Sequence, residues 1–372
     1  MRKLVLITWF LVMVIFASCG LKNKTRQNAP WSKERARKWA EQVFPIKGAN
    51  YLPRTAVNTT EMWQASTFDP DIIDQELSWA EQAGYNSMRV FLQYLVWEND
   101  PEGFKKRLHE FLSIANNHHI RIMLVTFDDC AFDAGRGPYL GKQAEPIPGV
   151  HNSRWTPSPG HERVTDRSTW PNLERYIKDL IREFGQDKRV LIWDLYNEPR
   201  VWEGYGGYNS FPLVEAAFRW AREVGPSQPL TVGVTWGRRF NRYIPPVYEL
   251  CDVISFHGYG EPDYVREQIA ICKVYHRPVL CTEWLRRQVG NTFDAILPIS
   301  AEEHIGWYHW GLVAGRTQTY LHWGSKKGDP TPEIWQHDVF HPDGTPYDKT
   351  EMDKVSAFVF FSFCYPLYRI FA

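Results

Sequence analysis

The sequence predicts an α/β protein that folds as a single (β/α)8 barrel, the TIM-barrel architecture. Short apolar runs alternate with amphipathic helical stretches from about residue 31 to residue 350, a pattern typical of parallel strands joined by helices. The 372 residues suffice for one large barrel domain, or for two smaller domains. A doubly wound open sheet is the alternative, but no glycine-rich phosphate loop follows the first expected strand.

Eight runs rich in β-branched or aromatic residues are the expected strands. Helices are expected between them wherever apolar and charged residues recur three or four positions apart. Two long connections follow the third and fourth strands, and in a barrel such loops build the active-site face. The strands cover 46–51, 86–92, 120–127, 190–196, 229–236, 252–257, 278–283 and 317–322; the clearest helices cover 70–82, 104–116, 173–184 and 264–274; and the long loops cover 128–171 and 199–211.

The composition indicates what kind of partner the protein has. It contains 17 Trp, 18 Tyr and 21 Phe, so aromatic residues make up 15% of the chain. So many large rings need a large core, or a surface that binds flat, partly apolar ligands such as sugars. The 43 basic and 43 acidic residues leave no net charge, which argues against a nucleic-acid partner because phosphate binding needs a basic excess.

The N-terminus reads as an export signal. A basic start and an apolar run over 4–16 precede Ala17-Ser18-Cys19, and the run is too short for an ordinary membrane-spanning helix. The segment resembles the signal peptide of a bacterial lipoprotein, although Phe16 stands where Leu is usual. This implies removal of residues 1–18, a lipid on Cys19, a polar tether over 19–30, and a protein held on a membrane of the cell envelope. A plain secretory signal is the alternative.

The remaining cysteines and the C-terminal segment say little about function. The five cysteines after the signal show neither CxxC spacing nor a disulfide framework, and no HExxH sequence occurs, so no metal and no cofactor are expected. Residues 351–372 are largely apolar but contain Pro366 and Arg369. This segment could be the last barrel helix or an irregular hydrophobic cover, and its role stays open.

Two glutamates stand at the ends of expected strands. Glu198 follows the fourth strand within Asn197-Glu198-Pro199, and Glu283 ends the seventh strand. In a barrel the tips of these two strands face each other across the mouth. Hydrolysis of a glycosidic bond needs one carboxylic acid to protonate the leaving oxygen and a second carboxylate to meet the developing oxocarbenium carbon. The two glutamates can supply this chemistry.

The Asn-Glu-Pro sequence after an apolar strand resembles the signature of clan A glycoside hydrolases. Over roughly residues 46–325 the chain is most similar to glycoside hydrolase family 5, the group of cellulases, mannanases and β-glycosidases. The resemblance implies a retaining O-glycosyl hydrolase that acts on a β-linked glycan or glycoside, with Glu198 as acid/base and Glu283 as nucleophile. The family's arginine on the second strand matches Arg89. Its His-x-Tyr on the sixth strand matches His257 and Tyr259.

Further substrate-binding residues are expected from the same resemblance. The family's eighth-strand tryptophan, which forms a floor for the sugar ring, matches Trp323, with Trp310 as the second candidate. Trp236, at the end of the expected fifth strand, is also included. The family usually has a histidine at the end of the third strand, where this chain has Asp128 and Asp129. These carboxylates could bind sugar hydroxyls, or they could cap the turn that follows.

The proposed chemistry sets requirements on the charge and position of the site residues. Glu283 must stay ionised, so Arg89 and Tyr259 are expected beside it. Glu198 must carry a proton, so we expect a dry setting that raises its pKa. Asn197 would contact the sugar 2-hydroxyl, which requires a bend at the strand tip because neighbouring strand residues point to opposite faces. A retaining pair has its carboxyl groups about 5–5.5 Å apart.

Two questions stay open. Asp194, inside the fourth strand, is expected to be a buried hydrogen-bonded group and not a third catalytic acid. A non-catalytic, lipid-anchored carbohydrate-binding barrel is the alternative function, although the presence of both glutamates argues against it. The sugar, the linkage and the choice between endo and exo action depend on loops such as 128–171.

Overall fold

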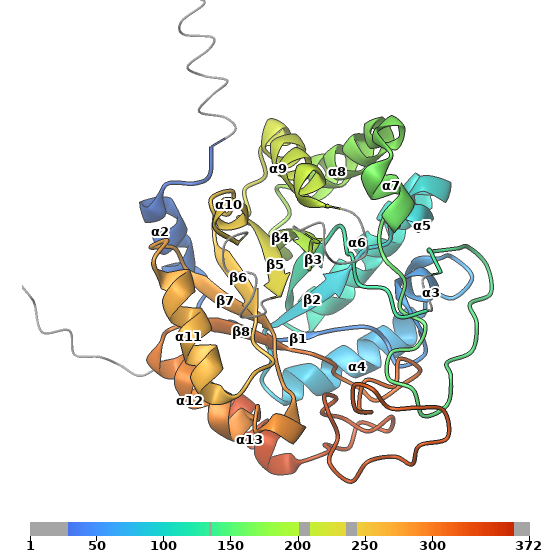
Figure 1. Cartoon of the computed structure of the whole chain (residues 1–372), viewed down its shortest axis with the longest axis vertical. Helices are drawn as coiled ribbons and strands as arrows, with labels where there is room; N and C mark the ends of the chain where they lie inside the picture. Colours follow the sequence, from blue (N-terminus) through green and yellow to red (C-terminus); the bar gives the residue numbers. More distant parts are fainter. Residues whose placement is uncertain (1–28, 134–135, 201–208, 236–243, 361–372) are drawn as a thin grey trace, which may run out of the picture.

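The computed structural model describes residues 29–133, 136–200, 209–235 and 244–360. Its eight parallel strands close into a barrel in sequence order, with β8 paired to β1, which confirms the predicted fold (Figure 1). The strands are β1 (Lys47–Asn50), β2 (Ser87–Phe91), β3 (Arg121–Val125), β4 (Val190–Asn197), β5 (Leu230–Thr235), β6 (Ile254–His257), β7 (Val279–Glu283) and β8 (Gly306–His309).

The expected eighth strand is wrong. Residues 317–322 lie in the loop after β8, and the true strand is the four-residue run from Gly306 to His309, which pairs with β1 and β7. Pairing with these two neighbours, and not its own sequence, defines this strand. The alternating run after it forms hydrogen bonds with the loop after β3; for example, the amide of Asn152 donates to the carbonyl oxygen of Thr317 at 2.8 Å.

Helices surround the barrel, and the expected helices correspond to α4, α6, α8 and α11. Helix α4 begins where expected because the Asp69 side chain accepts from the amide of Ile72 and Pro70 occupies the first turn. The helices are α2 (Lys33–Val43), α3 (Thr59–Trp63), α4 (Pro70–Gln82), α5 (Tyr94–Asn99), α6 (Pro101–Asn117), α7 (His161–Thr165), α8 (Trp170–Phe184), α9 (Phe211–Val224), α10 (Ile244–Tyr248), α11 (Pro262–Lys273), α12 (Phe293–Glu302) and α13 (Lys349–Ala357), with short 3-10 turns η1 (Arg167–Thr169) and η3 (Arg287–Val289).

Helix α2 precedes the barrel and covers its N-terminal end. Trp39 and Val43 of this helix pack against buried residues near the starts of the strands, including Met123, Ile192 and Leu280. This apolar contact closes the bottom of the barrel. The opposite end, where the strands finish, is therefore the end that is open for a site.

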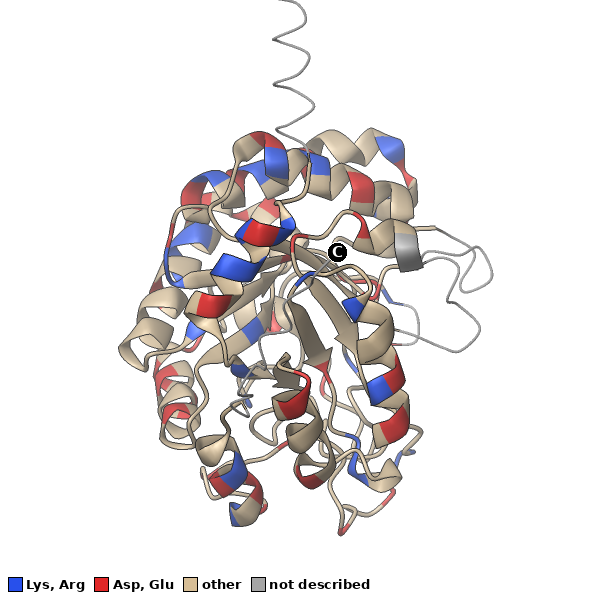
Figure 2. Ribbon diagram, turned by 90° about the vertical axis from the view of Figure 1, so that its left-hand side faces the viewer, with Lys and Arg blue, Asp and Glu red and all other residues tan. Residues whose placement is uncertain are grey.

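Charged residues are spread over the outer helices with both signs interspersed, in keeping with the neutral net charge (Figure 2). Within the described ranges, no helix combines the length and apolar character needed to cross a membrane. The expected signal peptide, Cys19 and residues 361–372 lie outside the described residues. The described part of the C-terminal segment forms the rest of α13 and places Phe358 against Trp307.

Candidate active site

The two predicted glutamates meet at the C-terminal mouth of the barrel. Glu283 is the last residue of β7 and Glu198 directly follows β4. His257 is at the end of β6. One oxygen of each carboxylate and one ring nitrogen of His257 all lie within 4.8 Å of one another. Glu283 is buried, whereas the Glu198 side chain is 22% exposed. The carboxylates therefore face a shared space with Glu198 on the more open side.

The strand tip at Glu198 is bent. Glu198 has a φ of +44°, and the pairing of β4 with β5 shifts register between Asp194 and Asn197. The amide of Glu198 still donates to the carbonyl oxygen of Gly233 at 2.8 Å, so the bend is held by β5. The bend lets Asn197 and Glu198 both reach the site, as the sequence required.

Arg89 connects the strands beneath the site. Its side chain is fully buried, and Nη1 donates to Glu283 Oε1 at 2.7 Å and to Asn50 Oδ1 at 2.8 Å. Its Nη2 donates to Asp194 Oδ2 at 2.8 Å and to Asn197 Oδ1 at 2.6 Å. Arg89 is thus the expected partner of Glu283. Asp194 is the expected buried structural group and shares the guanidinium charge.

Tyr259 and His257 complete the contacts of the two carboxylates. The Tyr259 hydroxyl donates to Glu283 Oε2 at 2.9 Å, as predicted. His257 Nδ1 lies 2.6 Å from Glu198 Oε1 and 3.4 Å from Glu283 Oε2, while its buried Nε2 has no hydrogen-bond partner. A Cβ on Gly233 would lie 2.9 Å from Nε2, so only glycine fits beside the ring. His257 therefore bridges the two carboxylates through one nitrogen.

The pKa values of Glu198 and Glu283 shift in the directions opposite to those expected from the sequence. Burial raises the pKa of Glu283, and the charges of His257 and Arg89 offset this only in part. Burial also favours the neutral form of Glu198, but the hydrogen bond and charge of His257 lower its pKa overall. The expected raised pKa of Glu198 is therefore wrong for this arrangement. The contact with His257, which the sequence could not show, is the reason.

Asp128 and Asp129 are buried and have different partners. Asp128 accepts from Asn197 Nδ2 at 2.8 Å and from Trp155 Nε1 at 2.7 Å, and burial raises its pKa to about 7. Asn197 thus has its amide oriented from both sides, by Arg89 at the oxygen and by Asp128 at the nitrogen. Asp129 instead binds Tyr196, Arg200 and Ser210.

These contacts change the role expected for the acidic pair. Asp128 supports Asn197 beside the two glutamates, because its oxygens already accept hydrogen bonds from protein groups. Asp129 holds together both ends of the loop that follows β4. Both side chains are buried, and Asp128 also accepts from the amide of Cys130 at 2.9 Å, which caps the turn that follows. The capping interpretation therefore fits better than direct sugar binding.

Cys130 is a site residue that sequence analysis missed. Its thiol donates to Glu198 Oε2 at 3.2 Å, opposite the oxygen that contacts His257. Burial and the neighbouring carboxylates raise the pKa of this thiol well above its usual value, so it stays a neutral donor. The only signal in the sequence was its position two residues after Asp128. The four cysteines among the described residues are free, in line with the absence of a disulfide framework.

Trp155, Trp310 and Trp323 lie on the loops that follow β3 and β8. Trp310 directly follows β8, so it occupies the eighth-strand position that was assigned first to Trp323. Trp323 lies farther along the same loop, 43% exposed, with its ring centroid 4.9 Å from that of Tyr259. Trp155 is buried against Phe91 and Trp310. The remaining predicted tryptophan, at position 236, lies outside the described residues.

Glu198, His257 and Glu283 also form a cluster of possible metal ligands within the described residues. Two ligands on one zinc ion, bound at about 2.0–2.2 Å, lie roughly 3.3 Å apart. The 2.6 Å contact between Glu198 and His257 is shorter, and Arg89 already donates to Glu283. The three side chains are therefore arranged as a hydrogen-bonded set and do not fit a metal site.

Comparisons of the structure find barrels of known glycosidases. An endo-1,4-β-D-mannanase from Thermotoga petrophila RKU-1 is 14% identical with a TM-score of 0.56, over 85% of this chain and 100% of that one. A GH5_18 variant from Bifidobacterium longum, in complex with Manβ1-4GlcNAc, is 13% identical with a TM-score of 0.58, over 84% and 77%. The exo-β-1,4-mannosidase Op5Man5 from an Opitutaceae bacterium is 19% identical with a TM-score of 0.56, over 84% and 59%. At these low identities, the TM-scores show a shared fold and nothing more.

Comparison of the sequence identifies the family. No curated protein matches the chain. The model of the cellulase family, glycosyl hydrolase family 5, matches residues 49–313, which run from β1 to just beyond β8 and include both glutamates. Membership implies hydrolysis of glycosidic bonds. The chain belongs to glycosyl hydrolase family 5.

Proposed function

We propose that the protein is a retaining β-glycosidase in which Glu283 is the nucleophile and Glu198 the acid/base. The observation that supports this most directly is that one oxygen of each carboxylate lies within 4.8 Å of the other across the barrel mouth. Retaining enzymes place their carboxyl groups about 5–5.5 Å apart, whereas inverting enzymes need about 6.5–9.5 Å to admit a water. The short separation favours retention.

In the first step, Glu283 attacks the anomeric carbon while the bond to the leaving oxygen breaks. Arg89 and Tyr259 each donate to one oxygen of this carboxylate, so its orientation is fixed before the attack. Glu198 gives its proton to the leaving oxygen. Asn197, oriented by Arg89 and Asp128, presents its amide beside the same space.

The proton on Glu198 depends on His257. The interaction that lowers the pKa of Glu198 is with a charged His257. A neutral His257 lacks that charge and can accept a hydrogen bond from the protonated Glu198 carboxyl over their 2.6 Å contact. Two carboxylates this close repel each other, so the pair disfavours having both groups ionised at once. In the second step, the deprotonated Glu198 takes a proton from water while the water oxygen bonds to the anomeric carbon. The bond from that carbon to Glu283 breaks, and the sugar leaves with its original configuration.

A change of Glu198 to Ala tests the acid role. We expect kcat/KM for glycosides with alkyl or sugar leaving groups to fall by about 10²–10⁴-fold, because these leaving oxygens need a proton. The loss should be much smaller for dinitrophenyl β-glycosides, whose leaving group departs without one. Glu110→Ala, on the exposed face of α6, is the matched control. Equal losses on both substrate types would remove Glu198 from this role.

The substrates for this test come from a screen of the wild-type protein against aryl β-glycosides and plant polysaccharides. NMR of the first product then reports its anomeric configuration, and inversion would contradict the double displacement. Binding of a glycan with no cleavage of any substrate would instead support the non-catalytic carbohydrate-binding barrel.

We also propose that the protein is exported and held on a membrane of the bacterial cell envelope by a lipid on Cys19. The support is the short apolar run at 4–16 that ends in Ala17-Ser18-Cys19. Expressed in a bacterium, the full chain should partition into the detergent phase, and Cys19→Ser should not. Detergent partitioning of both forms would contradict the lipid attachment at this cysteine.

A further inference from the structure

The turn after β3, residues 128–130, holds the backbone around Glu198. Before Glu198, the amide of Asp129 donates to the carbonyl oxygen of Asn197 at 3.2 Å. After it, the amide of Arg200 donates to Asp129 Oδ2 at 2.9 Å. The turn therefore binds the chain on both sides of Glu198, whose φ of +44° is costly for a residue with a side chain.

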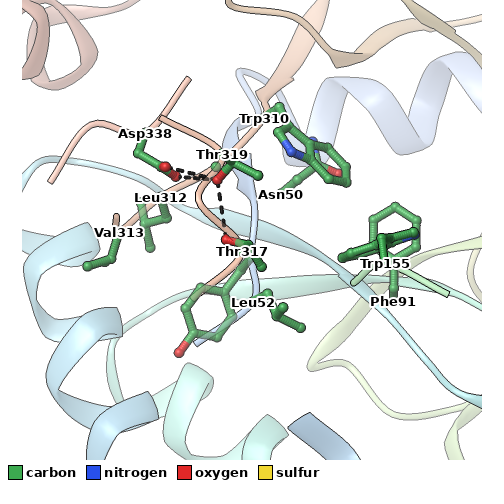
Figure 3. A pocket seen from close by; sticks show the side chains of 12 residues that line it. Asn50, Leu52, Phe91, Trp155, Trp310, Leu312, Val313, Thr317, Thr319 and Asp338 are labelled. Atoms are coloured by element: carbon green, nitrogen blue, oxygen red, sulfur yellow. Dashed lines mark hydrogen bonds between the residues drawn. The ribbon is translucent and has the colours of Figure 1, made fainter. Parts of the chain in front are cut away.

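The position of the turn is itself fixed by buried groups. Asp128 Oδ1 accepts from Asn197 Nδ2 at 2.8 Å and from the amide of Cys130 at 2.9 Å. Its Oδ2 accepts from Trp155 Nε1 at 2.7 Å. Trp155 is buried against Phe91, and both rings line a narrow hollow (Figure 3). The backbone of Cys130 is thus set by a buried carboxylate that a buried ring holds in place.

From this position, Cys130 turns its thiol toward the carboxylate of Glu198. Its Sγ lies 3.2 Å from Glu198 Oε2, while Oε1 of the same carboxylate lies 2.6 Å from His257 Nδ1. Asn197 Nδ2 donates to the sulfur at 3.6 Å, so the thiol hydrogen can point at Glu198. The two oxygens of Glu198 therefore have different partners, the thiol on one and the imidazole on the other.

The groups around Glu198 act on its charge in different ways. Burial raises its pKa, whereas the hydrogen bond and charge of His257, the hydrogen bond of Cys130 and the charge of Arg89 lower it. The thiol is neutral, so its contribution is a hydrogen bond alone and does not depend on the charge of His257. Among the described residues, the titratable or charged side chains around this carboxylate and thiol are His257 from β6, Tyr259 just after it, Arg89 from β2, Glu283 from β7 and Asp128 from the turn after β3.

We propose that Cys130 is a positioning residue for proton transfer: its thiol holds Oε2 of Glu198 and stabilises the carboxylate that forms when Glu198 protonates the leaving oxygen and that later takes a proton from water. In the first step the bond from the anomeric carbon to the leaving oxygen breaks as that oxygen receives the proton. The thiol keeps its own proton throughout. This inference rests on the proposed function and adds a residue on which its acid/base group depends.

The hydrogen bond from Cys130 favours one protonation state of Glu198 over the other. A donor binds an ionised carboxylate more strongly than a protonated carboxyl, because the acceptor then carries a negative charge. The thiol therefore lowers the free energy of ionised Glu198 relative to its protonated form. It also leaves Oε1, on the side of His257, as the oxygen that carries the proton, in agreement with a neutral His257 that accepts the hydrogen bond.

The test isolates the second step of the reaction. A 2-deoxy-2-fluoro-β-glycoside of the sugar found by the substrate screen, with a dinitrophenyl leaving group, traps the sugar on Glu283. The return of activity then requires an ionised Glu198 to activate water, so its rate falls at low pH as Glu198 becomes protonated. In Cys130→Ala the pKa of Glu198 should rise, and this fall should occur about 0.5–1 pH unit higher than in the wild-type protein.

Three further variants complete the comparison, each with its Tm recorded. Cys130→Ser keeps a hydroxyl donor, so its pH profile should return toward that of the wild type. Cys130→Val has no donor but fills the space of the thiol, so it should repeat the shift even where the Ala variant is unstable. Cys251→Ala is the matched control, because it removes a buried thiol that contacts the carbonyl oxygen of Val247 outside the site. It should leave the profile unchanged.

The outcomes separate this inference from the proposed function. An unshifted or lowered midpoint in the folded Cys130 variants without a donor would overturn the inference and leave the proposed function standing. A full shift in Cys130→Ser, or an equal shift in Cys251→Ala, would also overturn it, because the effect would then not depend on a donor at Glu198. If no sugar becomes attached to Glu283, double displacement is refuted and the inference fails with it.

Discussion

Changing Glu283 to Gln is expected to lower turnover by at least about 10⁴-fold, because the neutral amide cannot attack the anomeric carbon. The change keeps the size of the side chain, and its oxygen can still accept the hydrogen bond from Arg89 Nη1 that Glu283 Oε1 accepts at 2.7 Å. Folding should therefore be affected much less than activity. The measurement is kcat on the substrate identified by the screen, with circular dichroism and Tm recorded on the same preparation.

Glu267→Gln is a matched control, because this exposed glutamate on α11 lies outside the site. It should leave kcat unchanged. Near-normal activity of the Glu283 variant on the same substrate would show that this residue is not the nucleophile. If the Glu283→Gln variant lost activity because it unfolds, its Tm would fall as well. The milder Glu283→Asp change, which keeps the charge but shortens the side chain, would then separate loss of the nucleophile from loss of folding.

Changing Arg89 to Met is expected to have the largest effect on stability, a loss of about 3–5 kcal/mol in the free energy of unfolding. The variant leaves the buried carboxylates of Asp194 and Glu283 without their common partner. It also removes the positive charge that opposes the effect of burial on Glu283, so the pKa of Glu283 rises further. Activity should fall with stability. Denaturant unfolding at neutral pH measures the loss in the free energy of unfolding.

The surface pair of Arg37 and Glu41 on α2 provides the control, since Arg37→Met should cost about 0–1 kcal/mol. Adding Asp194→Asn to the Arg89 variant should recover part of the lost stability, because one of the two unpaired charges is gone. A loss below about 1 kcal/mol for Arg89→Met alone would contradict the role of its buried ion pairs.

The sequence predicted what depends on local pattern. The runs ending at Glu198 and Glu283 are apolar and bounded by clear loops, so both glutamates could be placed at strand tips. The alternation of eight strands with helices, without a glycine-rich loop after the first strand, then favoured a barrel over an open sheet. The short strand at Gly306–His309 could not be found this way, because what defines it is its pairing with β1 and β7 and not its own residues.

What could not be predicted depends on contacts between distant segments. The thiol of Cys130 reaches Glu198, and His257 lowers the pKa of Glu198, only because three strand ends meet at one point. Likewise, Asp129 faces Ser210 and not the site because the loop after β4 returns to it. No periodicity marks such contacts. They decide the protonation and orientation of the residues that the sequence had already found.

The bend at Glu198 has a consequence for how this protein can change over time. A φ of +44° is costly for a residue with a side chain and costs glycine nothing, so a glycine at this position would relieve strain. Selection for thermal stability alone would thus favour losing the very carboxylate that we assign to proton transfer. We therefore expect glutamate to be kept at this position in lineages that are selected for turnover as well as for folding.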